Sequence, residues 1–168
     1  FTTVLGGYLV VSTAYSLYIK RLLLLDVFLL AGLYTLRVLA GGVATAIVIS
    51  PWLAAFSMFF FTSLAFLKRY SELRLLHERQ MTATRGRDYA VADMDMLRSI
   101  GSASGYVSVL VLALYTNSAE VLELYPRPTA LWLVLPVLLY WITRIWFLAH
   151  RGQVADDPIL FTVRDRTS

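Results

Sequence analysis

The sequence predicts an all-α polytopic helical membrane bundle. Three observations favour this fold class: 58% of the 168 residues are hydrophobic, only 15% are charged, and apolar runs of membrane-spanning length recur along the chain. A helix needs about twenty apolar residues to cross the hydrocarbon core of a bilayer, and a soluble domain of this size would carry more charge. The runs predict five transmembrane helices in this segment.

The first two helices are predicted over residues 3–19 and 22–49, with the basic pair Lys20 and Arg21 between them. The first run contains several small residues, which allow a neighbouring helix to approach closely. The second run is almost wholly apolar and ends before Ser50-Pro51, where proline favours the first turn of the next helix.

Two charged residues interrupt the second run. Asp26 lies near one end and Arg37 near the middle, eleven residues apart, so both point to one face, which Tyr34 and Gly41 share. Asp26 also suits the first turn of a helix, where the helix dipole favours an anion. An arginine at mid-membrane depth costs at least about 2.5 kcal/mol, so Arg37 should face protein, an anion or water. We expect this helix to form one wall of a polar cavity.

The later part of the chain alternates apolar runs with polar connections. The mixed charges of the long connection indicate a solvated loop, and the end of the chain is mostly polar. The predicted elements are helices over residues 51–78, 96–115 and 129–149, a cytoplasmic loop over 79–95 and a cytoplasmic tail over 150–168.

Five spans require successive connections to alternate between the two sides of the membrane, and the basic residues fit this rule. Twelve of the fifteen lie on the side that holds Lys20, the 79–95 loop and the tail, whereas the other side has only Arg127. The positive-inside rule places the basic side in the cytoplasm. We expect a multi-pass protein of the bacterial cytoplasmic membrane.

Composition also excludes several functions. The chain contains no cysteine, which excludes disulfides, thiolate metal sites and cysteine nucleophiles. Its net charge of +4 comes from residues at membrane edges, so we expect membrane lipid and no nucleic acid as a partner. The two histidines are far apart in sequence, and no Gly-rich phosphate loop, HExxH or GxSxG motif is present.

A group of charged residues lies where the third helix leaves the membrane. Lys68, Arg69 and Glu72 share this edge with Lys20. One interpretation is an interfacial belt whose side chains reach toward the headgroups, with an ordinary ion pair between Lys68 and Glu72. The other is a diphosphate site, because arginine offers a bidentate fork and lysine a compact charge.

The tail adds two carboxylates on the same side. Asp156 and Asp157 are candidates to hold Mg²⁺ together with substrate phosphates, as is Glu72. Asp156 and Asp157 suit equally well the cap of a helix that begins at Pro158.

Four stretches in order resemble the UbiA superfamily of intramembrane prenyltransferases. More narrowly they are similar to the bacterial branch that contains polyprenyl-phosphate phosphoribosyltransferases and members fused to a haloacid-dehalogenase-like domain. The resemblance covers nearly the whole chain. The stretches are YSLYIK over residues 15–20, AGLYTLRVLAGG over 31–42, KRYSEL over 68–73 and LFTVRDR over 160–166.

This resemblance implies a bundle of about nine helices around a central cavity, with two acidic motifs that bind Mg²⁺ and diphosphate at the cytoplasmic face. The chain then corresponds to part of that domain, with the first acidic motif expected before Phe1. A fused or partner domain upstream is a further expectation. The second motif falls on residues 68–72, where only Glu72 is acidic. This departure points away from aromatic acceptors.

The sequence and this resemblance therefore predict one partial transmembrane domain, residues 1–168, of a Mg²⁺-dependent integral membrane prenyltransferase of the UbiA type, with its active face in the cytoplasm. It acts on a polyprenyl phosphate or diphosphate, with loss of diphosphate. We expect this segment alone to be inactive. Lys20, Arg37, Lys68 and Arg69 are the expected diphosphate-binding residues, and Glu72 is the expected catalytic residue.

Two alternatives stay open. In one, the polyprenyl phosphate is the acceptor and a phosphoribosyl diphosphate the donor, which adds a diphosphate-bearing co-substrate. In the other, the protein is a membrane transporter or scaffold, a function for which inverted repeats with interrupted helices are typical. No convincing repeat relates the two halves of the sequence.

Overall fold

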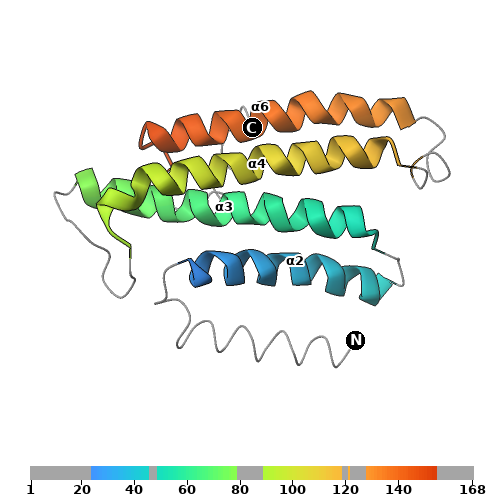
Figure 1. Cartoon of the computed structure of the whole chain (residues 1–168), viewed down its shortest axis with the longest axis horizontal. Helices are drawn as coiled ribbons and strands as arrows, with labels where there is room; N and C mark the ends of the chain where they lie inside the picture. The colour runs from blue at the N-terminus through green and yellow to red at the C-terminus, as the bar shows by residue number, and fades with distance from the viewer. Residues whose placement is uncertain (1–23, 46–48, 79–88, 119–120, 122–127, 155–168) are drawn as a thin grey trace.

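The computed structural model describes residues 24–45, 49–78, 89–118, 121 and 128–154 (Figure 1). All regular elements in these ranges are helical. They are α2 (Leu25–Thr45), α3 (Pro51–Glu78), the 3₁₀ helix η2 (Val91–Asp93), α4 (Met94–Thr116), the 3₁₀ helix η3 (Pro128–Leu133) and α6 (Val134–His150).

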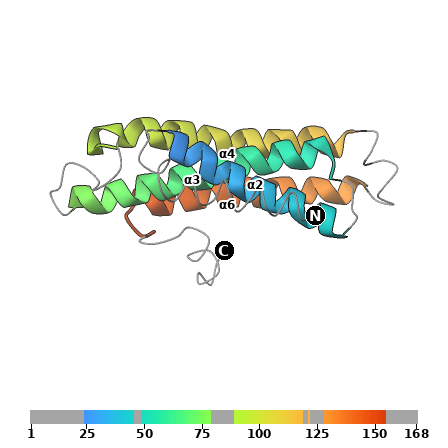
Figure 2. The same ribbon diagram turned by 90° about the horizontal axis from the view of Figure 1, so that it is seen from below.

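The four long helices lie side by side, and each runs antiparallel to the one before it (Figures 1 and 2). Helix α3 lies between α2 and α4, and α6 packs against α4 and α3. Four helices in the described ranges are long and apolar enough to cross a membrane, over 25–45, 51–78, 91–116 and 130–150. The predicted class, a helical membrane bundle, is confirmed. The fifth predicted span, 3–19, lies outside the described residues.

Helix α3 has the predicted bounds, whereas the bounds of the other helices differ. Helix α2 begins at Leu25 and not at residue 22, because Leu24 has a left-handed backbone with φ of 64°. Helix α4 is longer than the predicted 96–115 because η2 leads directly into it. The last span begins as η3, and Pro136 then lies in the first turn of α6, where its missing N–H leaves no helical bond unmade.

Glycines bring α4 close to its neighbours. A Cβ atom added at Gly101 would lie 2.5 Å from Trp146 of α6 and 2.7 Å from the Cβ of Phe66 of α3. One added at Gly105 would lie 2.8 Å from Ile142. Small residues of this kind let helix backbones approach in a membrane, where apolar burial alone gives little driving force.

Aromatic rings join α2 to α3. Phe28 meets Phe66 edge to face at 6.1 Å between ring centroids, and Tyr34 stacks on Phe61 at 5.3 Å. The stripe of α2 that was expected to line a polar cavity therefore turns toward α3 at Tyr34. At the start of the helix, Asp26 of the same stripe also contacts α3, through a hydrogen bond from Arg69.

Candidate functional site

A buried polar cluster connects the start of α2, the last third of α3 and the residues just before η2. We call it the Asp26 cluster, and its members are Asp26, Arg69, Glu72 and Tyr89. Asp26 is fully buried and the side chain of Arg69 is only 2% exposed. The Nε of Arg69 donates to Oδ2 of Asp26 at 2.6 Å. Two opposite charges thus meet in an apolar interior, where their pairing offsets the desolvation cost of burying them.

Glu72 is a second carboxylate that pairs with Arg69, and it lies on the same helix. Nη1 of Arg69 lies 2.8 Å from both Oε1 and Oε2 of Glu72, three residues further along α3. The side chain of Glu72 is 30% exposed, so it is the accessible end of the cluster. Arg69 therefore holds Glu72 in one position and is itself held by Asp26.

Tyr89 closes the other side of the carboxylate. Its hydroxyl donates to Oδ1 of Asp26 at 2.6 Å and accepts from the backbone N–H of Leu24 at 2.9 Å. Burial and the hydrogen bond to Asp26 raise the pKa of Tyr89 above its usual 10.0. The prediction of a merely solvated loop over 79–95 is wrong at this residue, because Tyr89 is 3% exposed and fixes the loop end to α2.

The carboxylates of this cluster are already occupied. Both oxygens of Asp26 and both oxygens of Glu72 accept hydrogen bonds from Arg69 or Tyr89. Within the described ranges, no group of three or more His, Asp or Glu side chains is placed to hold a metal ion. The carboxylates described here do not by themselves form a Mg²⁺ site.

The expected site residues fall into three groups. Arg69 and Glu72 are brought together, with Lys68 half-buried beside them on α3. Arg37 lies on an exposed part of α2, its Cζ 5.1 Å from the centroid of the Tyr34 ring. It is separated from Asp26 by eleven residues, about 16 Å of helix rise. Lys20, Asp156 and Asp157 lie outside the described residues.

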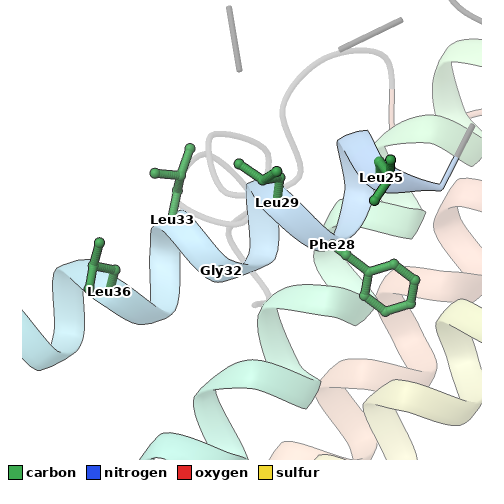
Figure 3. Close-up of a pocket in the computed structure, with 6 residues that line it drawn as sticks. All are labelled: Leu25, Phe28, Leu29, Gly32, Leu33 and Leu36. Atoms are coloured by element: carbon green, nitrogen blue, oxygen red, sulfur yellow. The ribbon is translucent and has the colours of Figure 1, made fainter. Parts of the chain in front are cut away.

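A pocket along α2 is apolar, and the residues that line it lie on a different face of the helix from the predicted polar stripe (Figure 3). It has a volume of about 370 Å³, and its lining contains no charged side chain. Asp26, in the first turn of α2, lies on the side of the helix that faces α3, where it pairs with Arg69. The lining residues are Leu25, Phe28, Leu29, Gly32, Leu33 and Leu36.

Sequence reasoning missed Asp26 and Tyr89 as members of the site. The sequence did contain one indication for Asp26. It lies at the start of one helix and Arg69 near the end of the next, and two antiparallel neighbouring helices bring such positions to the same level of the bundle. Tyr89 is 63 residues from Asp26 and follows no local pattern that marks it. Its role follows only from the fold.

No family model matches the sequence. An uncharacterized protein, y4nM of Sinorhizobium fredii, is 37% identical over 169 residues, which is 100% of this chain and 33% of that protein. Nodulation protein NoeC of Azorhizobium caulinodans is 33% identical over 164 residues, 97% of this chain and 53% of that protein. The chain therefore spans between a third and about half of these curated relatives.

A third relative is named for an enzymatic activity. Decaprenyl-phosphate phosphoribosyltransferase of Corynebacterium glutamicum is 37% identical over 76 residues, which cover 45% of this chain and 23% of that enzyme. This chain is thus similar, over part of its length, to a transferase that acts on a polyprenyl phosphate.

Proposed function

We propose that this chain is part of an integral membrane transferase of the UbiA type that acts on a polyprenyl phosphate. The observation that carries the proposal is the 37% identity over 76 residues to decaprenyl-phosphate phosphoribosyltransferase. A second feature supports it: a fixed arginine and a partly exposed glutamate lie at one end of a bundle of membrane-spanning helices.

The preferred reaction is phosphoribosyl transfer. An oxygen of the polyprenyl phosphate attacks C1 of a phosphoribosyl diphosphate, the C1–O bond to the diphosphate breaks, and diphosphate leaves with the bonding electrons. The similarity favours this reaction over prenyl transfer, in which the diphosphate instead leaves an allylic carbon of the lipid. Both reactions need cationic groups at the leaving diphosphate.

Each residue of the proposed site has a distinct role. Lys20, Arg37 and Lys68 contact phosphate groups of the substrates. Arg69 contributes positive charge there and, through Asp26, fixes the height and orientation of the α3 end. Glu72 orients the attacking group, because it is the one carboxylate of the Asp26 cluster that is partly exposed.

Mg²⁺ dependence belongs to this proposal because the resemblance implies it. The cation would neutralise charge on the leaving diphosphate. Asp156 and Asp157 are its candidate ligands in this chain, with Glu72 as a further one. We assign no step of the reaction to the metal, because the described carboxylates are engaged by Arg69 and Tyr89. The distribution of basic residues supports an active face on the cytoplasmic side of a bacterial inner membrane.

The test uses the full-length native protein in membrane vesicles. Labelled phosphoribosyl diphosphate with a polyprenyl phosphate should give a labelled lipid, and removal of Mg²⁺ should stop the reaction. A second assay supplies a prenyl diphosphate and a hydroxybenzoate acceptor. Product in the second assay alone would replace phosphoribosyl transfer by prenyl transfer. Product in neither assay, at normal folded yield, would favour the transporter or scaffold.

A pair of glutamates on one helix supplies a matched control. Glu72→Gln should lower turnover by about 10²- to 10⁴-fold if the carboxylate acts on the reacting group. Glu78→Gln should leave turnover near that of the wild type, because Glu78 forms an exposed pair with Arg74 at 3.2 Å. Folded yield is measured for both variants. Equal turnover of a well-folded Glu72→Gln variant would remove Glu72 from the site.

A further inference from the structure

A second pocket lies between the start of α4 and the end of α6. Its volume is about 250 Å³, and it shares no residue with the Asp26 cluster. Unlike the pocket along α2, it combines polar with aromatic side chains. Both helix ends that form it lie at the same end of the bundle as the start of α2 and the end of α3 (Figure 1). This places the pocket near a membrane surface and not at its midplane.

Arg98 supplies a permanent positive charge at this pocket. Its side chain is 44% exposed, and its Nη2 lies 3.3 Å from Oδ1 of Asp95, whose side chain is 90% exposed. An exposed pair of this kind holds its members weakly. The guanidinium can therefore turn toward a phosphate, which it binds through two parallel N–H groups.

His150 supplies a second donor. Its Nδ1 lies 3.0 Å from the hydroxyl of Tyr70, a residue that is 2% exposed. Either of these two atoms can be the donor. In the tautomer that accepts from Tyr70 at Nδ1, the Nε2 nitrogen carries the proton and can donate to a ligand.

The hydroxyl groups of the pocket are arranged to accept. Ser99 donates its proton to the carbonyl of Asp95, Ser102 to that of Arg98 and Thr143 to that of Leu139, each at 2.8 Å. Since a hydroxyl has one proton, the remaining lone pairs of these oxygens can accept. Thr143 Oγ1 also lies 3.3 Å from the hydroxyl of Tyr106, so it has fewer positions left for a ligand than Ser99 or Ser102. The pocket therefore offers donors for an anion and acceptors for a hydroxyl or ammonium group beside that anion.

The flank of the pocket is apolar and open to the surroundings of the helix. Phe147 is 60% exposed, and Trp146 lines the pocket while its indole N–H donates to Ser63 at 3.2 Å. A soluble phosphate would make no use of this flank. A phospholipid would fill it with the glycerol backbone and the first carbons of its acyl chains.

We propose that this pocket binds the headgroup of a phospholipid whose phosphate diester carries a hydroxyl-bearing alcohol, such as phosphatidylglycerol. The phosphate lies against Arg98 and His150, and the headgroup hydroxyls donate to the oxygens of Ser99, Ser102 and Thr143. A choline headgroup offers no N–H or O–H donor, so the pocket discriminates against phosphatidylcholine.

The test measures lipid binding to the purified full-length protein by native mass spectrometry, with phosphatidylglycerol and phosphatidylcholine supplied separately. The wild type should retain phosphatidylglycerol preferentially. Arg98→Gln should weaken this binding about tenfold, the effect of one lost hydrogen bond to a charged group. Arg74→Gln, which removes a partly exposed arginine from α3, should bind like the wild type.

Two further arms keep the result decisive. Ser102→Leu fills the pocket and removes an acceptor without changing charge, so it should also weaken phosphatidylglycerol binding. Soluble glycerol phosphate at millimolar concentration should not displace the lipid. Equal binding by Arg98→Gln and Arg74→Gln, equal retention of the two lipids, or displacement by glycerol phosphate would each overturn the proposal. Turnover is not a readout, so the outcome is independent of the proposed reaction.

Discussion

The two sides of α3 are held by different forces. On the α2 side, contact depends on the Asp26 cluster and two aromatic pairs, and a pocket of about 370 Å³ lies along α2. On the α4 and α6 side, glycines bring backbones so close that a single added carbon would overlap with Trp146 or Phe66. The α2 side therefore combines a buried ion pair with aromatic contacts, and the α4 and α6 side is packed most closely at its glycines.

The difference teaches how helices associate where lipid competes for apolar surface. Close backbone approach gains dispersion contacts over many residues, while a buried ion pair gives a specific register at one depth. The first kind of contact is broken by adding atoms, and the second by removing a charge. Substitutions of each kind test whether the two sides respond as differently as their contacts suggest.

The largest expected effect is at Asp26. Asp26→Leu removes the buried partner of Arg69 and should lower the free energy of unfolding by about 3–5 kcal/mol. The measurement is a denaturant titration of the detergent-solubilised protein. The double variant Asp26→Leu with Arg69→Leu should recover most of this loss, because no buried charge is left uncompensated. As a control, Asp95→Ala breaks only an exposed pair and should change stability by less than about 1 kcal/mol.

Tyr89 tests the same side of α3 with a smaller change. Tyr89→Phe removes a hydrogen bond to a charged carboxylate and should cost about 1.5–3 kcal/mol. The raised pKa gives a second signature. The protonated hydroxyl contributes stability that is fully present below the usual pKa of 10.0 and is lost as pH rises toward the raised value. Unfolding titrations above pH 10 should show this loss in the wild type and much less of it in Tyr89→Phe.

Gly101 tests the packed side. Gly101→Ala places a methyl group 2.5 Å from the indole of Trp146 and should destabilise the protein by about 1–3 kcal/mol. Gly32→Ala is the matched control, since an added Cβ there meets no atom of the described residues within 4 Å, and it should be neutral or stabilising by up to about 1 kcal/mol. Similar thermal unfolding of the two variants would show that α4 is not packed as tightly as described.

The smallest expected effect concerns a buried hydroxyl. Ser71 is 3% exposed, and its Oγ has no hydrogen-bond partner within the described part of the chain. Ser71→Ala should therefore leave stability unchanged or raise it by about 1 kcal/mol. Ser108, which is fully buried, donates to the carbonyl of Gly105 at 2.6 Å, so Ser108→Ala should cost about 0.5–1.5 kcal/mol. A larger loss at Ser71 than at Ser108 would contradict this assignment.

Local signals explain which parts of the fold were predictable from the sequence. The bounds of α3 followed from the turn at Pro51 and from the polar residues after Glu78. The start of α2 was predicted three residues early, because leucine seldom adopts the left-handed backbone that Leu24 has. The position of this turn is set by a bond to Tyr89, which is 65 residues away.

The site divides in the same way. Arg69 and Glu72 were predictable as neighbours because they are three residues apart on one helix. The second partner of Arg69, Asp26, was not, since it lies 43 residues away on another helix and no local spacing links the two. The only signal in the sequence was that Asp26 begins one helix and Arg69 lies near the end of the next. Which helices pack against each other had to be known before this signal could identify the pair. The phosphate-binding roles of Lys20, Arg37 and Lys68 stay predictions.

The bond between Asp26 and Arg69 also constrains the order of events during synthesis. The two residues are 43 positions apart, so at about 5–20 residues per second the carboxylate emerges several seconds before its partner. A charged carboxylate is costly within lipid during that interval. We therefore expect α2 to stay at the membrane surface until α3 has been synthesised. The two helices then enter the bilayer together as one hairpin, so that Asp26 leaves water only when Arg69 is there to pair with it.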